Sequence, residues 1–137
     1  MRAMAFGTFD HLHPGHLSYL SQAGVFGDEL IVVVARDENV LRGKGRLPQE
    51  NEEIRLQKVA DAIRELKINS RVILGNKTDR WQLLRELRPA FICLGYDQKV
   101  DLKALEELIT QERFFCEVKR MSAHYPEKYK SSLFKKD

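Results

Sequence analysis

Short apolar runs alternate along the chain with longer stretches in which apolar residues recur every three or four positions. Runs such as LIVVVA and AFICL are apolar at consecutive residues, as expected of strands that are covered on both faces of a sheet. This pattern predicts five strands, at residues 3–6, 29–35, 71–74, 90–94 and 114–119.

The stretches between these strands have the spacing of amphipathic helices. Leu17, Leu20 and Ala23 lie on one face of the first stretch, and acidic residues open the second, where they complement the helix dipole. Asp79 is a candidate N-cap for the third. We therefore predict helices at residues 15–23, 52–66, 79–87 and 101–111.

The alternation of strands and helices predicts an α/β fold, namely a three-layer α/β/α, Rossmann-like, doubly wound parallel sheet. Right-handed crossovers leave few topologies, of which strand order 3-2-1-4-5 is a common one. Ligands bind such a sheet at the carboxyl ends of the strands, where the strand order reverses. The loops GTFDHLHPGH and LGYDQ, which follow the first and fourth strands, would both open into that crevice.

Composition narrows the class of protein. A length of 137 residues suits one domain, which we assign to residues 1–137. The chain is 43% hydrophobic and 31% charged, and no apolar run approaches the roughly 18 residues that a membrane span needs. The first residues do not form a signal peptide, which predicts a cytoplasmic protein. A net charge of +3 is too small to indicate nucleic acid as the main partner.

The loop GTFDHLHPGH concentrates residues that are suited to binding phosphate. Gly7 would let a ligand approach the backbone closely, and Pro14 suits the first turn of a helix. The free N–H groups and the positive dipole end of that helix would form an anion site. His13 and His16, three residues apart, would project to one side and donate hydrogen bonds to phosphate oxygens. We therefore predict a polyphosphate site here.

Two other interpretations of these histidines are open. His11, His13 and His16 could bind zinc, although no cysteine or nearby acid completes a ligand set, and His13 and His16 could be ordinary polar residues at a helix end.

Cys93 and Cys116 lack a CxxC spacing, so we expect two buried free thiols. Because the sequence contains neither GxxxxGK[ST] nor GxGxxG, a P-loop or dinucleotide-binding protein is disfavoured.

The HPGH of the first loop resembles the HxGH signature of the nucleotidylyltransferase superfamily, the cytidylyltransferase-like proteins. Their second signature, a Ser/Thr-rich segment before a short helix near the C-terminus, is matched here by KYKSSLFKK. The arginine of the cytidylyltransferase form RTxGIST is missing. Nearly the whole chain resembles the archaeal-type FAD synthases, through GTFDHLHPGH, GDELIVVVARDE, KGR, VILG, LGYDQ and KSS.

The resemblance implies transfer of AMP from ATP to FMN, which gives FAD and pyrophosphate. The FMN phosphate would attack the α-phosphorus in line, so catalysis would consist of positioning and charge stabilisation. A divalent cation, Mg²⁺ by default, would be held mainly by the ATP phosphates. Related enzymes imply a homodimer. Open alternatives are transfer to glycerol 3-phosphate or a sugar phosphate, and a non-catalytic nucleotide-binding module.

The same resemblance implies the site residues. His13, His16 and Lys44 would be catalytic, with Lys44 on a mobile loop after the second strand. Residues 124–137 would form a C-terminal phosphate-binding segment. The nucleotide would contact residues from both ends of the chain: Thr8, Phe9, His13, Pro14, Gly15, His16, Asp97, Tyr125, Lys130, Ser131 and Ser132.

Four of the candidate residues have more than one interpretation. Arg55 would contact a phosphate or anchor a loop, and Lys44 could instead be a solvated charge. Asp97 would bind the ribose or base, or only cap the turn after the fourth strand. We interpret Trp81 as a core or interface residue rather than as a contact for a flavin ring.

Overall fold

The computed structural model describes residues 1–79 and 81–123, which form a five-stranded parallel sheet. Its strands are β1 (Arg2–Gly7), β2 (Glu29–Val34), β3 (Ser70–Leu74), β4 (Phe91–Leu94) and β5 (Glu117–Arg120). The strand order is β3-β2-β1-β4-β5, and every neighbouring pair is parallel. The predicted doubly wound sheet and its 3-2-1-4-5 order are therefore confirmed.

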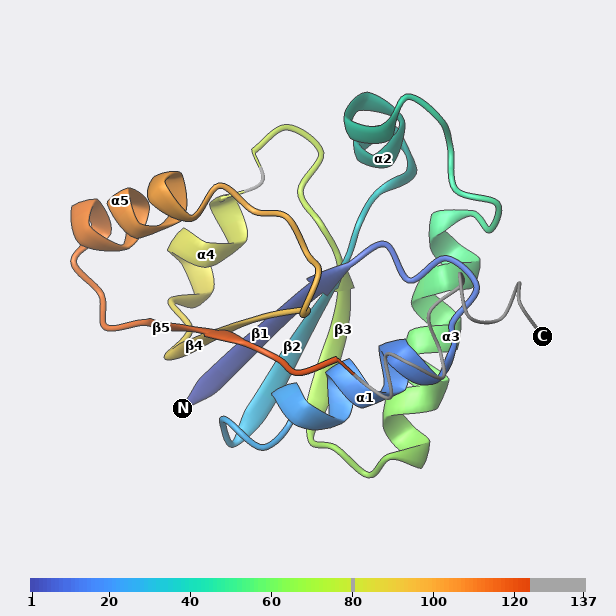
Figure 1. Ribbon diagram of the computed structural model, residues 1–137, viewed down its shortest axis with the longest axis horizontal. Helices are drawn as coiled ribbons and strands as arrows, with labels where there is room; N and C mark the ends of the chain where they lie inside the picture. Colours follow the sequence, from blue (N-terminus) through green and yellow to red (C-terminus); the bar gives the residue numbers. More distant parts are fainter. Residues whose placement is uncertain (80, 124–137) are drawn as a thin grey trace.

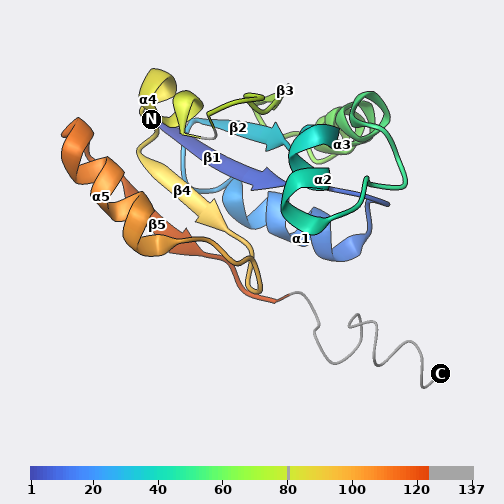
Figure 2. The same ribbon diagram turned by 90° about the horizontal axis from the view of Figure 1, so that it is seen from above.

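Helices cover both faces of the sheet (Figure 1). They are α1 (Pro14–Ala23), α2 (Asp37–Lys44), α3 (Glu52–Glu65), α4 (Gln82–Leu87) and α5 (Leu102–Glu112). Buried residues of α1 and α3 pack against one face, and those of α4 and α5 pack against the other. Helix α2 lies apart from both layers, beside the arrowheads of β1 and β2, at the carboxyl edge of the sheet (Figure 2).

Alternation along the central strands explains the two cores. In β1, Ala3 and Ala5 face α1 and α3, whereas Met4 faces α4 and α5, and all three side chains are fully buried. Strand β2 alternates in the same way. A strand whose successive side chains enter opposite cores must be apolar throughout, which is why LIVVVA has no polar positions.

The structure corrects several predicted bounds. Strand β5 begins at Glu117 rather than at residue 114, because Phe115 is 99% exposed and the Phe114 ring lies under the Arg88 guanidinium, 4.8 Å from it. Helix α4 begins at Gln82, three residues after its predicted start. Asp79 lies outside the helix, where its carboxylate accepts a hydrogen bond from the Trp81 N–H.

The helix α2 was not predicted, because residues 37–44 were expected to belong to a mobile loop. Only Val40 of this segment is buried, so its apolar pattern is too weak to indicate a helix. Other features stabilise it: acids in the first turn, bases in the last turn, and Gly45 at φ 79° as a left-handed C-cap. Lys44 therefore ends a helix.

Two smaller expectations can also be compared with the structure. Cys93 and Cys116 are free thiols, but only Cys93 is fully buried, and Cys116 is partly exposed. Burial raises the pKa of Cys93 to about 12 and that of Cys116 to about 11, so both stay protonated at neutral pH. Across the described ranges, none of the helices has the length and apolar character needed to cross a membrane.

Candidate active site

The loop after β1 leads directly into α1, and His13 is the N-cap of that helix. The His13 Nδ1 accepts a hydrogen bond from the Gly15 N–H at 3.1 Å, and the His16 Nδ1 accepts one from the His13 N–H at 3.2 Å. The arrangement is a reciprocal capping box in which imidazoles replace the usual side chains. The two rings consequently stack, with centroids 3.8 Å apart.

These hydrogen bonds determine the tautomer of both histidines. A neutral imidazole has one donor and one acceptor nitrogen, and here Nδ1 is the acceptor in each ring. The proton must therefore lie on Nε2. His13 and His16 are thus two N–H donors whose Nδ1 atoms are fixed to the backbone.

Burial keeps both rings neutral. Loss of solvent lowers the pKa of His16 to about 4, helped by the neighbouring His13, and lowers the pKa of His13 below its usual value. The Asp97 carboxylate opposes the shift in both cases. At pH 7 the histidines are therefore uncharged N–H donors.

The backbone donors at the start of α1 are not free, contrary to the prediction of an anion site built from them. Pro14 has no N–H, and the Gly15 N–H is bonded to the His13 ring. The N–H groups of His16 and Leu17 both donate to the His13 carbonyl oxygen, at 2.9 and 3.2 Å. Within this first turn, the hydrogen-bond donors available to a ligand are therefore the imidazole Nε2 groups.

The two glycines of the loop make room for side chains of the loop itself. A Cβ at Gly15 would lie 2.9 Å from Cε1 of His13, so glycine allows the cap to form. A Cβ at Gly7 would lie 2.8 Å from the Phe9 ring. We expected Gly7 to let a ligand approach the backbone, but the structure shows that glycine is needed there to make room for the Phe9 ring.

Phe9 forms the floor beneath the histidines. Its side chain is 3% exposed, and its ring meets the His16 ring edge-on at 5.4 Å between centroids. The Phe9 backbone is left-handed, at φ 56°, as is that of His11 at 52°. Two left-handed non-glycine residues in one loop are uncommon, and such conformations are concentrated at functional sites.

Lys44 reaches the same loop from the end of α2. Its Nζ donates a hydrogen bond to Thr8 Oγ1 at 3.3 Å, across 36 positions of sequence. The contact brings a cation from the last turn of α2 to the residue that follows β1. Lys44 is exposed and is held here by this one hydrogen bond. Its side chain can therefore exchange Thr8 for a ligand at little cost.

Arg55 anchors the loop and is not available to a phosphate. Its fully buried guanidinium donates to the carbonyl oxygens of Thr8 at 2.7 Å and Glu50 at 2.9 Å, and to Asp37 Oδ1 at 2.6 Å. One side chain on α3 thus holds the loop after β1, the segment before α3 and the start of α2. Of the two predicted roles, the structure supports the anchor.

Asp10 and His11 fasten the loop to residues 49 and 50. Burial acts to raise the pKa of Asp10, but hydrogen bonds from the N–H groups of Gln49 and Glu50 lower it below its usual value. The His11 N–H donates to Glu50 Oε1, and its ring is bonded to Gln49 Oε1. Neither side chain is directed by these bonds to the His13 and His16 rings, which argues against a three-histidine zinc site.

Two side chains that the sequence did not indicate, Tyr19 and Gln98, form hydrogen bonds at the ends of β1 and β4. The Tyr19 hydroxyl accepts from the Phe6 N–H and donates to the Cys93 carbonyl oxygen. The Gln98 amide donates to the Phe6 carbonyl oxygen and accepts from the Gly95 N–H. Side chains therefore connect the ends of the two strands here in place of direct backbone bonds. Only the position of Gln98 within LGYDQ could have indicated this.

The remaining candidates divide into two groups. Asp97 lies in the turn that Gln98 holds, is exposed, and is close enough to influence both histidines. Tyr125, Lys130, Ser131 and Ser132 lie outside the described residues, so their predicted contacts stay predictions. The structure therefore gathers Thr8, Phe9, Pro14 and Gly15 with the two histidines, Lys44 and Asp97 around the carboxyl ends of β1, β2 and β4.

Comparisons with known proteins agree with this fold. The family model described as cytidylyltransferase-like matches residues 4–137. The FAD synthase of Methanosarcina mazei is 45% identical over 88% of this chain and 76% of its own, and that of Thermoplasma volcanium is 39% identical over 99% and 92%. A crystal structure from Thermoplasma volcanium, titled as a lipopolysaccharide core biosynthesis protein, is 40% identical with a TM-score of 0.80, over 90% of this chain and 98% of its own. The chain therefore belongs to the cytidylyltransferase-like family, together with the archaeal FAD synthases.

Proposed function

We propose that this protein transfers the AMP group of ATP to the phosphate of FMN, forming FAD and pyrophosphate. One observation carries the proposal: two neutral imidazoles lie stacked at the sheet's switch point, each with Nδ1 bonded to backbone and Nε2 protonated. Relatives named FAD synthase, 45% and 39% identical to this chain, support the choice of FMN as acceptor.

The reaction needs no general base in this proposal. An oxygen of the FMN phosphate is already an anion near neutral pH and forms a bond to the α-phosphorus. The bond from that phosphorus to the bridging oxygen breaks, and pyrophosphate leaves with the electron pair. The protein's task is to align the two phosphates and to stabilise the charge that develops, as in other phosphoryl chemistry.

Each site residue then has a specific task. The Nε2–H groups of His13 and His16 would donate to the triphosphate, close to the positive end of the α1 dipole. Lys44 would leave Thr8 for a phosphate oxygen, and the Thr8 hydroxyl would become available to the α-phosphate. Asp97 would accept a hydrogen bond from the ribose or the base.

A divalent cation would enter with ATP. Within residues 1–79 and 81–123, no three histidine, cysteine or acidic side chains gather as an ion site, and Asp10 is committed to two backbone N–H groups. This donor set fits a cation held mainly by phosphates and water. When bound, such an ion neutralises negative charge on the phosphates, and Mg²⁺ is the expected species.

A sugar phosphate is the second candidate acceptor. One observation favours it: a structural neighbour, 40% identical to this chain, is titled as a lipopolysaccharide core biosynthesis protein. The nucleotide half of the site would be the same for both acceptors, so the histidine pair does not discriminate between them. Glycerol 3-phosphate is a weaker candidate, because the arginine of RTxGIST is missing from the tail.

A panel of substrates tests the proposal. The purified protein is given Mg²⁺ with ATP or CTP, and FMN, riboflavin, glucose 1-phosphate or glycerol 3-phosphate, while pyrophosphate release is measured. We expect release only with ATP and FMN. Riboflavin is the matched control, because it has the same ring system without the attacking phosphate. Pyrophosphate release with CTP and glycerol 3-phosphate, or release with glucose 1-phosphate but not with FMN, would reject FMN as the acceptor.

Further expectations complete the proposal. Residues 124–137 would supply Lys130, Ser131 and Ser132 to the β- and γ-phosphates, and Tyr125 to the nucleotide. The protein would act in the cytoplasm as a homodimer and as one domain over residues 1–137. Alanine at both Ser131 and Ser132 should raise KM for ATP while leaving KM for FMN nearly unchanged.

A further inference from the structure

A cavity of about 500 Å³ lies beside the candidate active site, between α2 and the segment that follows β3. Its walls include Asn39 and Arg42 of α2, the segment Asn76–Asp79, and Trp81. Both elements follow carboxyl ends of neighbouring strands, so the cavity lies at the same edge of the sheet as the histidine loop. A volume of this size is in the range of small-molecule sites.

The cavity adjoins the reacting centre through consecutive residues. Gly43 lines the cavity, and the next residue, Lys44, donates to Thr8 in the histidine loop. The last turn of α2 is therefore the wall between the cavity and the phosphate-binding loop. A ligand whose anionic end lies at Lys44 could extend its remaining bulk into the cavity.

The charge of the lining favours an anionic ligand. Arg42 and Lys77 are both exposed there, whereas the one acid of the lining, Asp79, is neutralised by Arg85 at 2.5 Å. Arg42 donates to Asn39 Oδ1 and to the Lys77 carbonyl oxygen, which fixes the guanidinium across the cavity. Lys77 has only a 4.0 Å contact with Glu38, so its charge is nearly uncommitted.

The lining also includes an aromatic surface. The Trp81 side chain packs against the core cluster between the sheet and α4, as the sequence analysis expected, and it also borders the cavity. An indole together with two cations suits a planar aromatic ring that carries a phosphate, and it is poorly matched to a small polyol phosphate.

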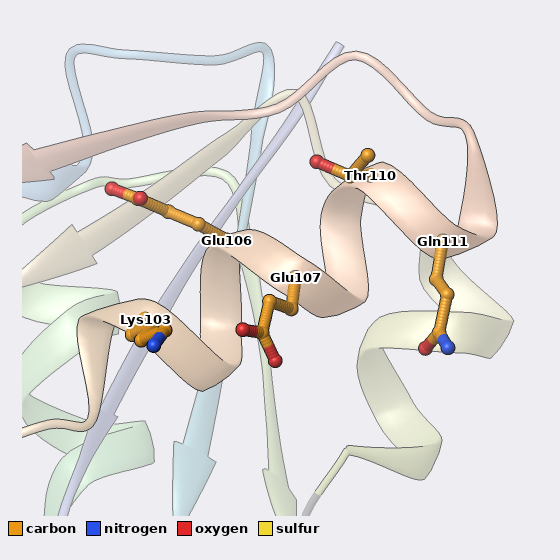
Figure 3. A pocket seen from close by; sticks show the side chains of 5 residues that line it. All are labelled: Lys103, Glu106, Glu107, Thr110 and Gln111. Atoms are coloured by element: carbon orange, nitrogen blue, oxygen red, sulfur yellow. The ribbon is translucent and has the colours of Figure 1, made fainter.

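The second cavity-like surface does not offer this chemistry. Figure 3 shows that its lining residues all come from one helix, α5: Lys103, Glu106, Glu107, Thr110 and Gln111. Two carboxylates there would repel an anion, and α5 packs on the face of the sheet away from α1. This surface is therefore used as the place for a control substitution and is not a candidate ligand site.

We infer that the cavity between α2, the segment Asn76–Asp79 and Trp81 binds the aromatic ring of the phosphorylated acceptor, with Trp81 beside the ring and Arg42 and Lys77 near its anionic chain. The inference rests on the proposed adenylyl transfer for its orientation, with the phosphate toward Lys44. It assigns the selectivity for a flavin over a polyol to residues that are separate from the histidine pair.

Two measurements test the inference, and the first does not depend on turnover. FMN is titrated into the protein without ATP while flavin fluorescence is recorded. Indole in stacking contact quenches flavin emission, so we expect strong quenching with the native protein. With Trp81→Leu we expect weaker binding and less quenching at saturation, both partly restored in Trp81→Phe. FMN binding that is equally tight and equally quenched in Trp81→Leu would overturn the inference.

The second measurement compares Michaelis constants. The double variant Arg42→Ala/Lys77→Ala should raise KM for FMN by about tenfold, a change typical of losing two charge contacts, and should change KM for ATP by less than about twofold. Lys103→Ala on α5 is the matched control and should change neither. An unchanged KM for FMN in the double variant refutes the cavity assignment while leaving the proposed reaction intact. Failure of the native protein to form FAD, with FMN still bound in the cavity, refutes the reaction alone.

Discussion

Gly15 and His13 are matched in shape: a Cβ on Gly15 would lie 2.9 Å from Cε1 and 3.0 Å from Nδ1 of the His13 ring. The glycine of the HPGH motif is thus needed because an imidazole folds back over the helix end. The ring position depends on that space, and so does the direction of its Nε2–H group.

The first prediction concerns Gly15→Ala. The added methyl should displace the His13 ring and break its bond to the residue 15 N–H. Loss of a cap costs about 1 kcal/mol, but alanine in a helix recovers about 0.5–1 kcal/mol, so the free energy of unfolding should change little. Adenylyl transfer should fall by at least about tenfold. Urea denaturation measures the free energy of unfolding, and steady-state rates measure adenylyl transfer. A large loss of stability, or unchanged activity, would contradict the explanation.

The second prediction separates the histidines by role. His16→Ala removes an N–H donor from the proposed triphosphate site and should lower kcat by about 10²–10³-fold, the usual cost of one such donor. His11→Ala is the matched control, because His11 is bonded to Gln49 and Glu50 instead. Its rate should stay within a few-fold of the native rate. Similar losses in both variants would mean that loop order, not donation, is being measured.

The third prediction follows from the lowered pKa of His16. The folded-state pKa is about 4 and the unfolded value is 6.5, so the unfolded chain binds more protons between these pH values. Stability should therefore be complete above pH 6.5 and decrease as the pH falls toward 4. After allowing for the partial exposure of the ring, the loss by pH 5 is on the order of 1 kcal/mol.

Urea denaturation at pH 7.5 and pH 5 measures this decrease, and the same pair of measurements on His16→Gln should give a smaller one. Nitrogen-resolved NMR of the imidazoles offers an independent check, since both rings should carry their proton on Nε2 at pH 7. A His16 that titrates near 6.5 would contradict the structural reasoning.

Much of the fold could be predicted from the sequence because hydrophobic periodicity reports burial. Continuous apolar runs located the central strands β2 and β4, which are covered on both faces. The same logic failed at Phe114 and Phe115, since two consecutive aromatic residues resemble a strand but one is bound under Arg88 and the other is exposed. It failed again at α2, which buries only Val40.

The candidate site divides in a similar way. His13, His16 and Lys44 could be chosen from residue type and spacing, because phosphate chemistry needs donors and cations at a helix start. The role of Tyr19 could not, because its hydroxyl acts on the backbone of Cys93, which is distant in sequence. For Arg55 the sequence left two roles open, because the carbonyl oxygen of Thr8 that it binds is equally distant. Long-range partners of this kind leave no periodic signal along the chain.

The fourth prediction tests the buried clamp. Arg55→Leu leaves the carbonyl oxygens of Thr8 and Glu50 without their donor and the Asp37 carboxylate without its partner. Removing one member of a fully buried pair costs about 3–5 kcal/mol. Because the Asp37 carboxylate is 28% exposed, the free energy of unfolding should fall by an amount at the lower end of that range. Arg55→Lys should recover only part of it, because an ammonium group cannot reproduce the guanidinium fork. Thermal denaturation of both variants measures these losses. Native stability in Arg55→Lys would contradict the role of the three guanidinium hydrogen bonds.

The most direct test of the central claim follows the adenylyl group itself. ATP that carries ¹⁸O at the non-bridging oxygens of the α-phosphate is mixed with FMN, Mg²⁺ and the native protein, and the nucleotide products are analysed by mass spectrometry. We expect FAD with the added mass, together with unlabelled pyrophosphate, and about 10²–10³-fold less of this product from His16→Ala within the same time. Label found only in AMP, or FAD formation that proceeds unchanged without His16, would contradict this expectation.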